Sequence, residues 1–288
     1  MPFSWTLRGP RRGLLNARLA TTMLLAAVSV LGLTNSAQGA ALPTLKLSVT
    51  ASSITVTGSP QAGAVNVITS ATGVKEGLAI LFQLKPGVTP AQVYAYLATK
   101  AAGDPNGASK FGTIVFDSEA EPGKTFEAQT ILAPGEYLAL GGAGEGGPKT
   151  HAAFTVAPTA TPAVLPTPQA TVRSIDFGFR GPTTLHDGEV VRFENEGYLV
   201  HMDLAFPVKS KAVAQKAVKL LLAGKEKQIE KLIAGQPVGF AGPLSSGSFQ
   251  QETITAKPGW YVQVCFMETQ DGRDHTLLGM ERIIKIAK

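Results

Sequence analysis

The chain has 288 residues, with 26 basic and 21 acidic side chains and a single cysteine. Four of the basic residues, Arg8, Arg11, Arg12 and Arg18, lie in the first 40 residues, which contain no acid, so 22 basic and 21 acidic residues remain in the rest of the chain. That balance excludes the basic footprint of a nucleic-acid-binding protein. One cysteine also excludes an internal disulfide.

The first 40 residues have the layout of an export signal. Their arginines precede an apolar stretch, residues 22–33, which is followed by small residues around 37–41. We therefore predict a signal peptide over residues 1–40. The pair Arg11 and Arg12 is also typical of twin-arginine signals, so both export routes stay open. No later apolar run approaches the roughly 20 residues that span a bilayer. We expect an exported, extracytoplasmic protein (periplasmic, cell-envelope or secreted) with no stable transmembrane segment after signal cleavage.

Short β-branched or aromatic stretches, separated by Gly, Pro, Asp and Asn, dominate the rest of the chain. The predicted strands are 44–50, 53–57, 64–69, 78–84, 125–132, 136–141 and 152–156, then 172–179, 189–193, 198–206, 250–256, 260–266 and 281–286. Many short strands favour an all-β sandwich architecture. A proline-rich segment separates the two sets and predicts a semi-rigid linker. The predicted division is a first sandwich over 41–157, a linker over 158–170 and a second sandwich over 171–288.

The two sets of strands match each other in sequence. Residues 77–142 can be laid on residues 201–266 at a constant offset of 124. Both halves are therefore predicted to be copies of one fold. At this offset the first half has glycine where the second has His201 and Cys265, so we expect the first half to be structural, a spacer or a contact surface. Its solitary His151 is expected to be solvated.

A helical insertion interrupts each set. Residues 209–234 contain no proline, are rich in Ala, Leu, Lys and Glu, and place apolar residues at near-helical spacing with one break at Gly224. This pattern predicts two short amphipathic helices. Residues 90–100 form the shorter equivalent in the first half. An apolar stripe of this kind is compatible with membrane attachment, but packing against its own sandwich is favoured.

Four residues in the second half carry the clearest chemistry. Cys265 ends an apolar strand, His275 and Met280 follow it, and His201 lies one strand upstream. Two imidazoles, a thiolate and a thioether are the ligands that copper favours in a trigonal electron-transfer site with a weak axial bond. Adjacent strands lie about 4.8 Å apart, so the four side chains are expected to meet at one end of the sandwich. Taken singly, each residue also has a simpler interpretation. His201 would be a core histidine, His275 a surface loop residue, Met280 a methionine that fills a gap in the core, and Cys265 a buried thiol.

This C-terminal stretch resembles the ligand loop of cupredoxins, the blue copper family: Pro258-Gly259-Trp260-Tyr261-Val262-Gln263-Val264-Cys265, nine residues to His275, four to Met280, and a closing strand. The resemblance implies two cupredoxin-like Greek-key β-sandwiches in tandem, each with a short helical insertion. It also implies one type 1-like copper ion held by His201, Cys265, His275 and, as the long axial ligand, Met280. The Cys-to-His interval is closer to that of copper nitrite reductases than to that of plastocyanin or azurin. Met267 and His186 are the substitutes if the loop folds otherwise.

Two functions of different classes follow. The first is an exported copper-binding protein that transfers single electrons to a redox partner protein. The second is a metal-free two-domain β-sandwich that acts as an envelope interaction or structural module. An oxidase or nitrite reductase would need further histidine-rich copper sites, and only His151 and His186 are left over. Because no nucleophile, base and orienting group form a recognisable set elsewhere, we predict that the chain is not an enzyme.

Overall fold

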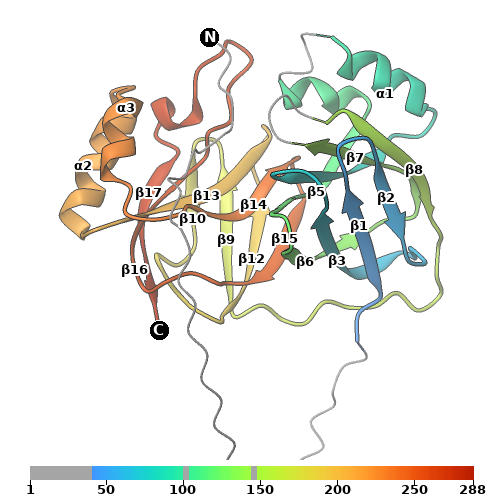
Figure 1. The fold of residues 1–288 in the computed structure, drawn as a ribbon, viewed down its shortest axis with the longest axis horizontal. Coiled ribbons are helices and arrows are strands. Elements are labelled where there is room, and N and C mark those ends of the chain that lie inside the picture. Colours follow the sequence, from blue (N-terminus) through green and yellow to red (C-terminus); the bar gives the residue numbers. More distant parts are fainter. Residues whose placement is uncertain (1–40, 100–103, 144–147) are drawn as a thin grey trace, which may run out of the picture.

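The computed structural model describes residues 41–99, 104–143 and 148–288, and strands are its main secondary structure (Figure 1). The predicted all-β class is confirmed. The predicted export signal lies outside the described residues. Within the described ranges, no helix is long and apolar enough to cross a membrane.

The first half, blue to green in Figure 1, consists of two packed layers of strands. One layer has the order β2-β1-β3-β6 and the other β5-β4-β7-β8. Their bounds are β1 (Thr44–Val49), β2 (Ile54–Thr57), β3 (Gly63–Ala71), β4 (Gly77–Leu84), β5 (Gly112–Ala120), β6 (Thr125–Leu132), β7 (Gly135–Ala143) and β8 (Thr150–Val156). The short helices α1 (Pro90–Leu97) and η2 (Pro105–Lys110) lie between β4 and β5 in the chain.

The second half has strands in a corresponding order. Its layers are β10-β9-β12-β15 and β11-β17-β16-β13-β14. The bounds are β9 (Ala170–Ile175), β10 (Gly178–Arg180), β11 (Thr184–His186), β12 (Val190–Asn195), β13 (His201–Val208), β14 (Val238–Leu244), β15 (Phe249–Thr253), β16 (Gly259–Val264) and β17 (Glu281–Ala287). The first layers of the two halves join into one eight-stranded sheet, where β15 pairs with β6 through Gln251 and Gln129. Greek-key connection and the domain boundary near residue 157 remain predictions.

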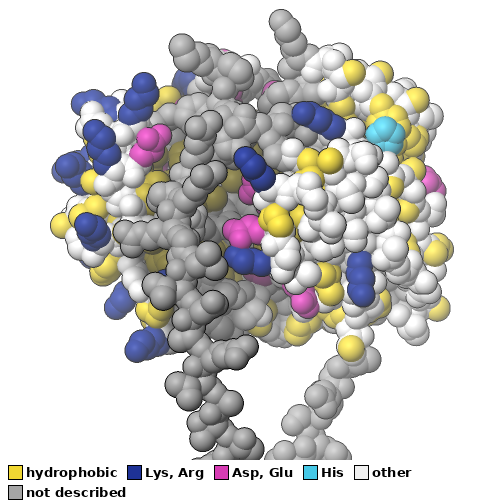
Figure 2. Space-filling view, viewed as in Figure 1, with side chains coloured by type: hydrophobic (Ala, Val, Ile, Leu, Met, Phe, Trp, Pro, Cys, Tyr) yellow, Lys and Arg dark blue, Asp and Glu magenta, His cyan; other side chains and the backbone are white. Residues whose placement is uncertain are grey.

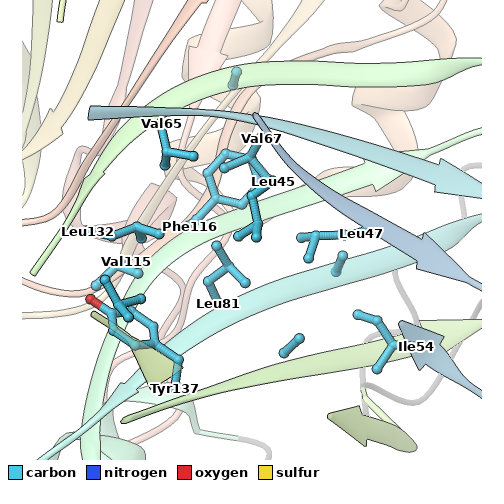
Figure 3. Close-up of a cluster of buried hydrophobic side chains, with 14 of the residues drawn as sticks. Leu45, Leu47, Ile54, Val65, Val67, Leu81, Val115, Phe116, Leu132 and Tyr137 are labelled. Atoms are coloured by element: carbon cyan, nitrogen blue, oxygen red, sulfur yellow. The ribbon is translucent and has the colours of Figure 1, made fainter. Parts of the chain in front are cut away.

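The core of the first half follows from strand alternation. Every second residue of β1 points inward, so Leu45 and Leu47 are buried while their neighbours are exposed. They pack with Leu81, Phe116 and Tyr137 from the opposite layer (Figure 3). A second apolar core fills the other half between its own layers.

The predicted helical insertion of the second half is confirmed and covers its five-stranded sheet. The helices α2 (Lys211–Leu222) and α3 (Glu226–Ile229) are separated near Gly224, and the 3-10 turn η3 (Glu230–Leu232) follows. Ala214, Ala217 and Leu221 of α2 belong to a buried cluster with side chains of β13 and β16. The apolar stripe is thus used for packing, while the lysines of this insertion gather on its outer surface, dark blue in Figure 2.

Three differences from the predicted strands matter for the site. The strand predicted over 172–179 is two strands, β9 and β10, which pair as a hairpin with Asp176 and Phe177 at its tip. The edge strands β5 and β14 are absent from the predicted set. Asp117 interrupts the apolar pattern of β5, and Pro243 together with two glycines interrupts the apolar pattern of β14. The halves meet along these two edges, where Ser245 donates its backbone N–H to the Ile114 carbonyl at 3.0 Å.

Candidate metal centre

The structure brings His201, Cys265 and His275 together at one end of the second half. His201 is the first residue of β13, Cys265 follows β16, and His275 begins the 3-10 turn η4 (His275–Leu278). The two strands are antiparallel neighbours, which places the start of β13 beside the end of β16. The exposed fraction of each of the three side chains is 1% or less.

The three donor atoms form a small triangle. The Nδ1 atoms of His201 and His275 are 3.1 Å apart, and the Cys265 Sγ lies 3.7 Å from the first and 3.4 Å from the second. Three donors bound at about 2.0 to 2.3 Å around one ion in a trigonal arrangement lie roughly 3.5 to 4 Å from each other. The triangle is therefore close to the size that a single ion requires, and its N₂S donor set suits copper.

The backbone of Met280 lies next to this triangle and is hydrogen-bonded to two of its residues. Its N–H donates to the His275 carbonyl at 3.0 Å, and its carbonyl accepts from the Cys265 N–H at 3.2 Å. Its side chain is buried in the same apolar cluster as Cys265 and Met267. Gly279 precedes it with a φ of 97°, a left-handed conformation that glycine adopts without strain and that turns the chain from η4 into β17.

The two remaining histidines do not reach the site. His186, a candidate substitute ligand, lies on β11 with its Nδ1 atom 3.5 Å from the Glu189 carboxylate. His151 is on β8 of the first half, exposed and stacked on Tyr94 with 3.6 Å between ring centroids.

His201 is oriented by Asp176 from the tip of the β9–β10 hairpin. The His201 Nε2 lies 2.5 Å from the Asp176 Oδ1, so the ring donates from Nε2 and turns Nδ1 as an acceptor toward Cys265. Burial alone would raise the pKa of Asp176, but the hydrogen bonds it accepts from the backbone of Tyr198 and Leu199 and from His201 hold that pKa below its usual value. A carboxylate on the far nitrogen is a common way to fix a metal-binding histidine.

Burial sets the protonation of the three donors. It lowers the pKa of His275 to about 4, with the neighbouring His201 adding to the effect. It also lowers the pKa of His201, against the opposing pull of Asp176. Burial raises the pKa of the Cys265 thiol to about 12, although a backbone N–H from Met202 at 3.4 Å works in the other direction. Neutral imidazoles are ready to bind a metal, and a bound cation would favour the thiolate.

Close packing at Gly197 holds the His201 ring in place. A Cβ at this position would lie 2.6 Å from the His201 Nε2 and 2.4 Å from the Asp176 Oδ1. The Gly197 N–H donates to the Asn195 Oδ1 at 2.9 Å, and the Asn195 amide donates to the carbonyls of Leu199 and Leu244. Neither Asp176 nor Gly197 stands out as a site residue from the sequence pattern.

The equivalent place in the first half is filled. Strand β4 begins at Gly77 and β13 at His201, which is the offset of 124 seen in the sequence. A Cβ at Gly77 would lie 2.8 Å from the Ala71 Cβ, and one at Gly141 would lie 2.5 Å from the Thr150 Oγ1. In the part of the chain that the structure describes, the donor cluster of the second half has no counterpart in the first.

The solved structures that are similar to this chain include several copper proteins. No protein-family model matches the chain, and neither does any curated protein. An auracyanin from Roseiflexus castenholzii is 18% identical over 41% of this chain and 95% of its own, with a TM-score of 0.25. A copper-containing nitrite reductase from Thermus scotoductus is 12% identical over 85% of this chain and 68% of its own, with a TM-score of 0.25. A multicopper oxidase is 9% identical over 85% and 88%, with a TM-score of 0.23.

These neighbours correct one prediction. The prediction that the chain is not an enzyme is wrong: copper nitrite reductases and multicopper oxidases, which are enzymes, are among the solved structures that the chain distantly resembles. What the comparisons confirm is the resemblance seen in the sequence: the chain is similar to blue copper proteins and copper enzymes.

Proposed function

We propose that the second half binds one copper ion through His201, Cys265, His275 and Met280, and that the protein transfers single electrons to and from a redox partner protein outside the cytoplasm. The observation that supports this most is the buried triangle of two imidazole nitrogens and a sulfur, with sides of 3.1, 3.4 and 3.7 Å. Copper bound there would supply a centre that alternates between Cu(I) and Cu(II).

The chain's own residues would keep that centre rigid. Asp176 fixes the ring of His201, the backbone of Met280 ties His275 to Cys265, and the Met202 N–H donates to the sulfur. A donor set that moves little between two oxidation states favours rapid electron transfer, because little reorganisation accompanies each step. The thiol is also fully buried, which protects an unpaired cysteine in an oxidising compartment.

Copper binding is tested by adding Cu(II) to the purified chain without residues 1–40 and recording its visible spectrum. We expect one copper per chain and an intense charge-transfer band that Cys265→Ser abolishes and His201→Ala weakens or shifts. Met280→Leu should keep the colour and raise the reduction potential. The matched control is His186→Ala, which removes a substitute ligand on β11 and should leave the band and the potential unchanged.

The same titration decides against the proposal if the wild-type protein stays colourless and retains no stoichiometric copper. That result would favour the metal-free two-domain module. Colourless binding of Zn(II) with no affinity for copper would also refute it, because zinc has no redox chemistry.

A further inference from the structure

We propose that the first half takes part in the metal centre, and that its Asn106 is a positioning residue for both ligand-bearing segments of the second half. This inference rests on the proposed copper site and extends it. It assigns the first half a task beyond that of a spacer, although none of the described residues of this half belongs to the donor cluster.

Asn106 reaches the site from the turn η2 across the interface between the halves. It is buried, with an exposed fraction of 8%. Its Oδ1 accepts from the backbone N–H of Val200 at 2.6 Å, and Val200 directly precedes His201. Its Nδ2 donates to the Glu268 carbonyl at 3.5 Å. Glu268 lies in the loop between Cys265 and His275, so one side chain contacts both segments that carry the donors.

The orientation of the Asn106 amide is fixed by its own half. Asp104 accepts from the Asn106 backbone N–H at 2.9 Å and from its Nδ2 at 2.9 Å. Reversing the amide would place its carbonyl oxygen against the Asp104 carboxylate and its NH₂ group against the Val200 N–H. The acceptor atom therefore points at the second half, and the contact is directional.

Apolar packing continues across the same interface. Cys265, Met267 and Met280 belong to one buried cluster with side chains of the first half. The first-half members are Phe82, Leu84, Val93, Ile114, Leu138 and Leu140. Leu244 pairs with His201 in the sheet, and the next residue, Ser245, accepts from the Ile114 N–H at 2.9 Å. The donors are thus held from the first half by a polar contact and by core packing.

Removing the Asn106 side chain should change the affinity of the site for its metal, in addition to weakening the contact between the halves. A metal site needs its ligands within about 0.5 Å of their working positions, and outer contacts of this kind typically change metal affinity 10- to 100-fold. A matched control is Thr130, whose Oγ1 donates to the Phe249 carbonyl at 2.9 Å across the β6–β15 seam. Thr130→Val removes one hydrogen bond between the halves and touches no ligand segment.

The test compares the full mature chain with Asn106→Ala, Asn106→Asp and Thr130→Val in two states. In the copper-loaded state, we expect Asn106→Ala to lose copper to a chelator at least about tenfold faster and to shift the charge-transfer band and reduction potential, while Thr130→Val matches the wild type. Asn106→Asp keeps the side-chain volume and the acceptor toward Val200, but it sets a second carboxylate oxygen against Asp104, so it should also change both readouts in the same direction. It also serves as the test variant if Asn106→Ala does not fold.

The second readout is independent of copper. In the metal-free protein we expect Cys265 of Asn106→Ala to react at least about tenfold faster with a thiol reagent than that of Thr130→Val or the wild type, because its loop opens more often. Equal behaviour of the Asn106 and Thr130 variants in both readouts would overturn the inference. If the wild type binds no copper, the proposed function fails, and the thiol reaction alone still decides the role of Asn106.

Discussion

Gly197→Ala is the sharpest test of how the His201 ring is held. The added Cβ would lie 2.6 Å from the ring Nε2, whereas ordinary contact begins at 3.4 Å, so the ring must retreat by about 0.8 Å or turn. That shift exceeds the roughly 0.5 Å within which a metal site must hold its ligands. The same Cβ would lie 2.4 Å from the Asp176 Oδ1, so the hydrogen bond that orients the ring breaks as well.

We expect Gly197→Ala to lower copper affinity 10- to 100-fold, measured by chelator competition, and to alter the visible spectrum. The matched control is Gly239→Ala on β14, where an added Cβ would meet no atom within 4 Å. Neither glycine has the positive φ that strains other residues, so the pair isolates the close approach to His201 from backbone effects. Unchanged affinity and spectrum in Gly197→Ala would refute the claim that this packing positions the ring.

Three further outcomes are expected. Asp176→Asn should weaken copper binding 10- to 100-fold and raise the reduction potential, because a negative charge beside His201 is lost, and an unaltered potential would contradict this. Burial, helped by Glu119, holds the pKa of Asp117 above its usual value, so the folded chain keeps this proton longer and loses stability as pH rises above about 4. Asp117→Asn should therefore gain more stability at pH 8 than at pH 4 in urea unfolding, and an equal gain at both pH values would count against it. Phe116→Ala, a deletion from a fully buried site, should cost about 3 to 5 kcal/mol of unfolding free energy, whereas Ile131→Ala at a side chain that is 47% exposed should cost far less, and similar losses would contradict the assigned core.

The sequence could predict those parts of the site that lie close together in the chain. Cys265, His275 and Met280 occupy one short segment, and His201 starts a strand whose match with β4 was visible at a fixed offset. The alternating strands and the amphipathic α2 were predictable for the same reason, since their periodicity is local.

The supporting residues could not be predicted from local patterns. Asp176 reaches His201 across 25 positions of the chain, and Asn106 reaches Val200 across 94. Both are polar residues in turns, where such residues are common for conformational reasons alone. The hairpin of β9 and β10 brings Asp176 to His201, and the packing of η2 against the other half brings Asn106 to Val200.

The packing at Gly77 and Gly141 limits how a second donor cluster like that of His201, Cys265 and His275 could be engineered or could evolve in this chain. Replacing these glycines by histidine and cysteine would drive the new side chains into Ala71, Val49, Ile54 and Thr150 before any ion arrived. Room for the new side chains would first require several simultaneous large-to-small substitutions at that end of the first half, and each of them would lower its stability. Single substitutions toward such a second donor cluster would therefore pass through destabilised variants.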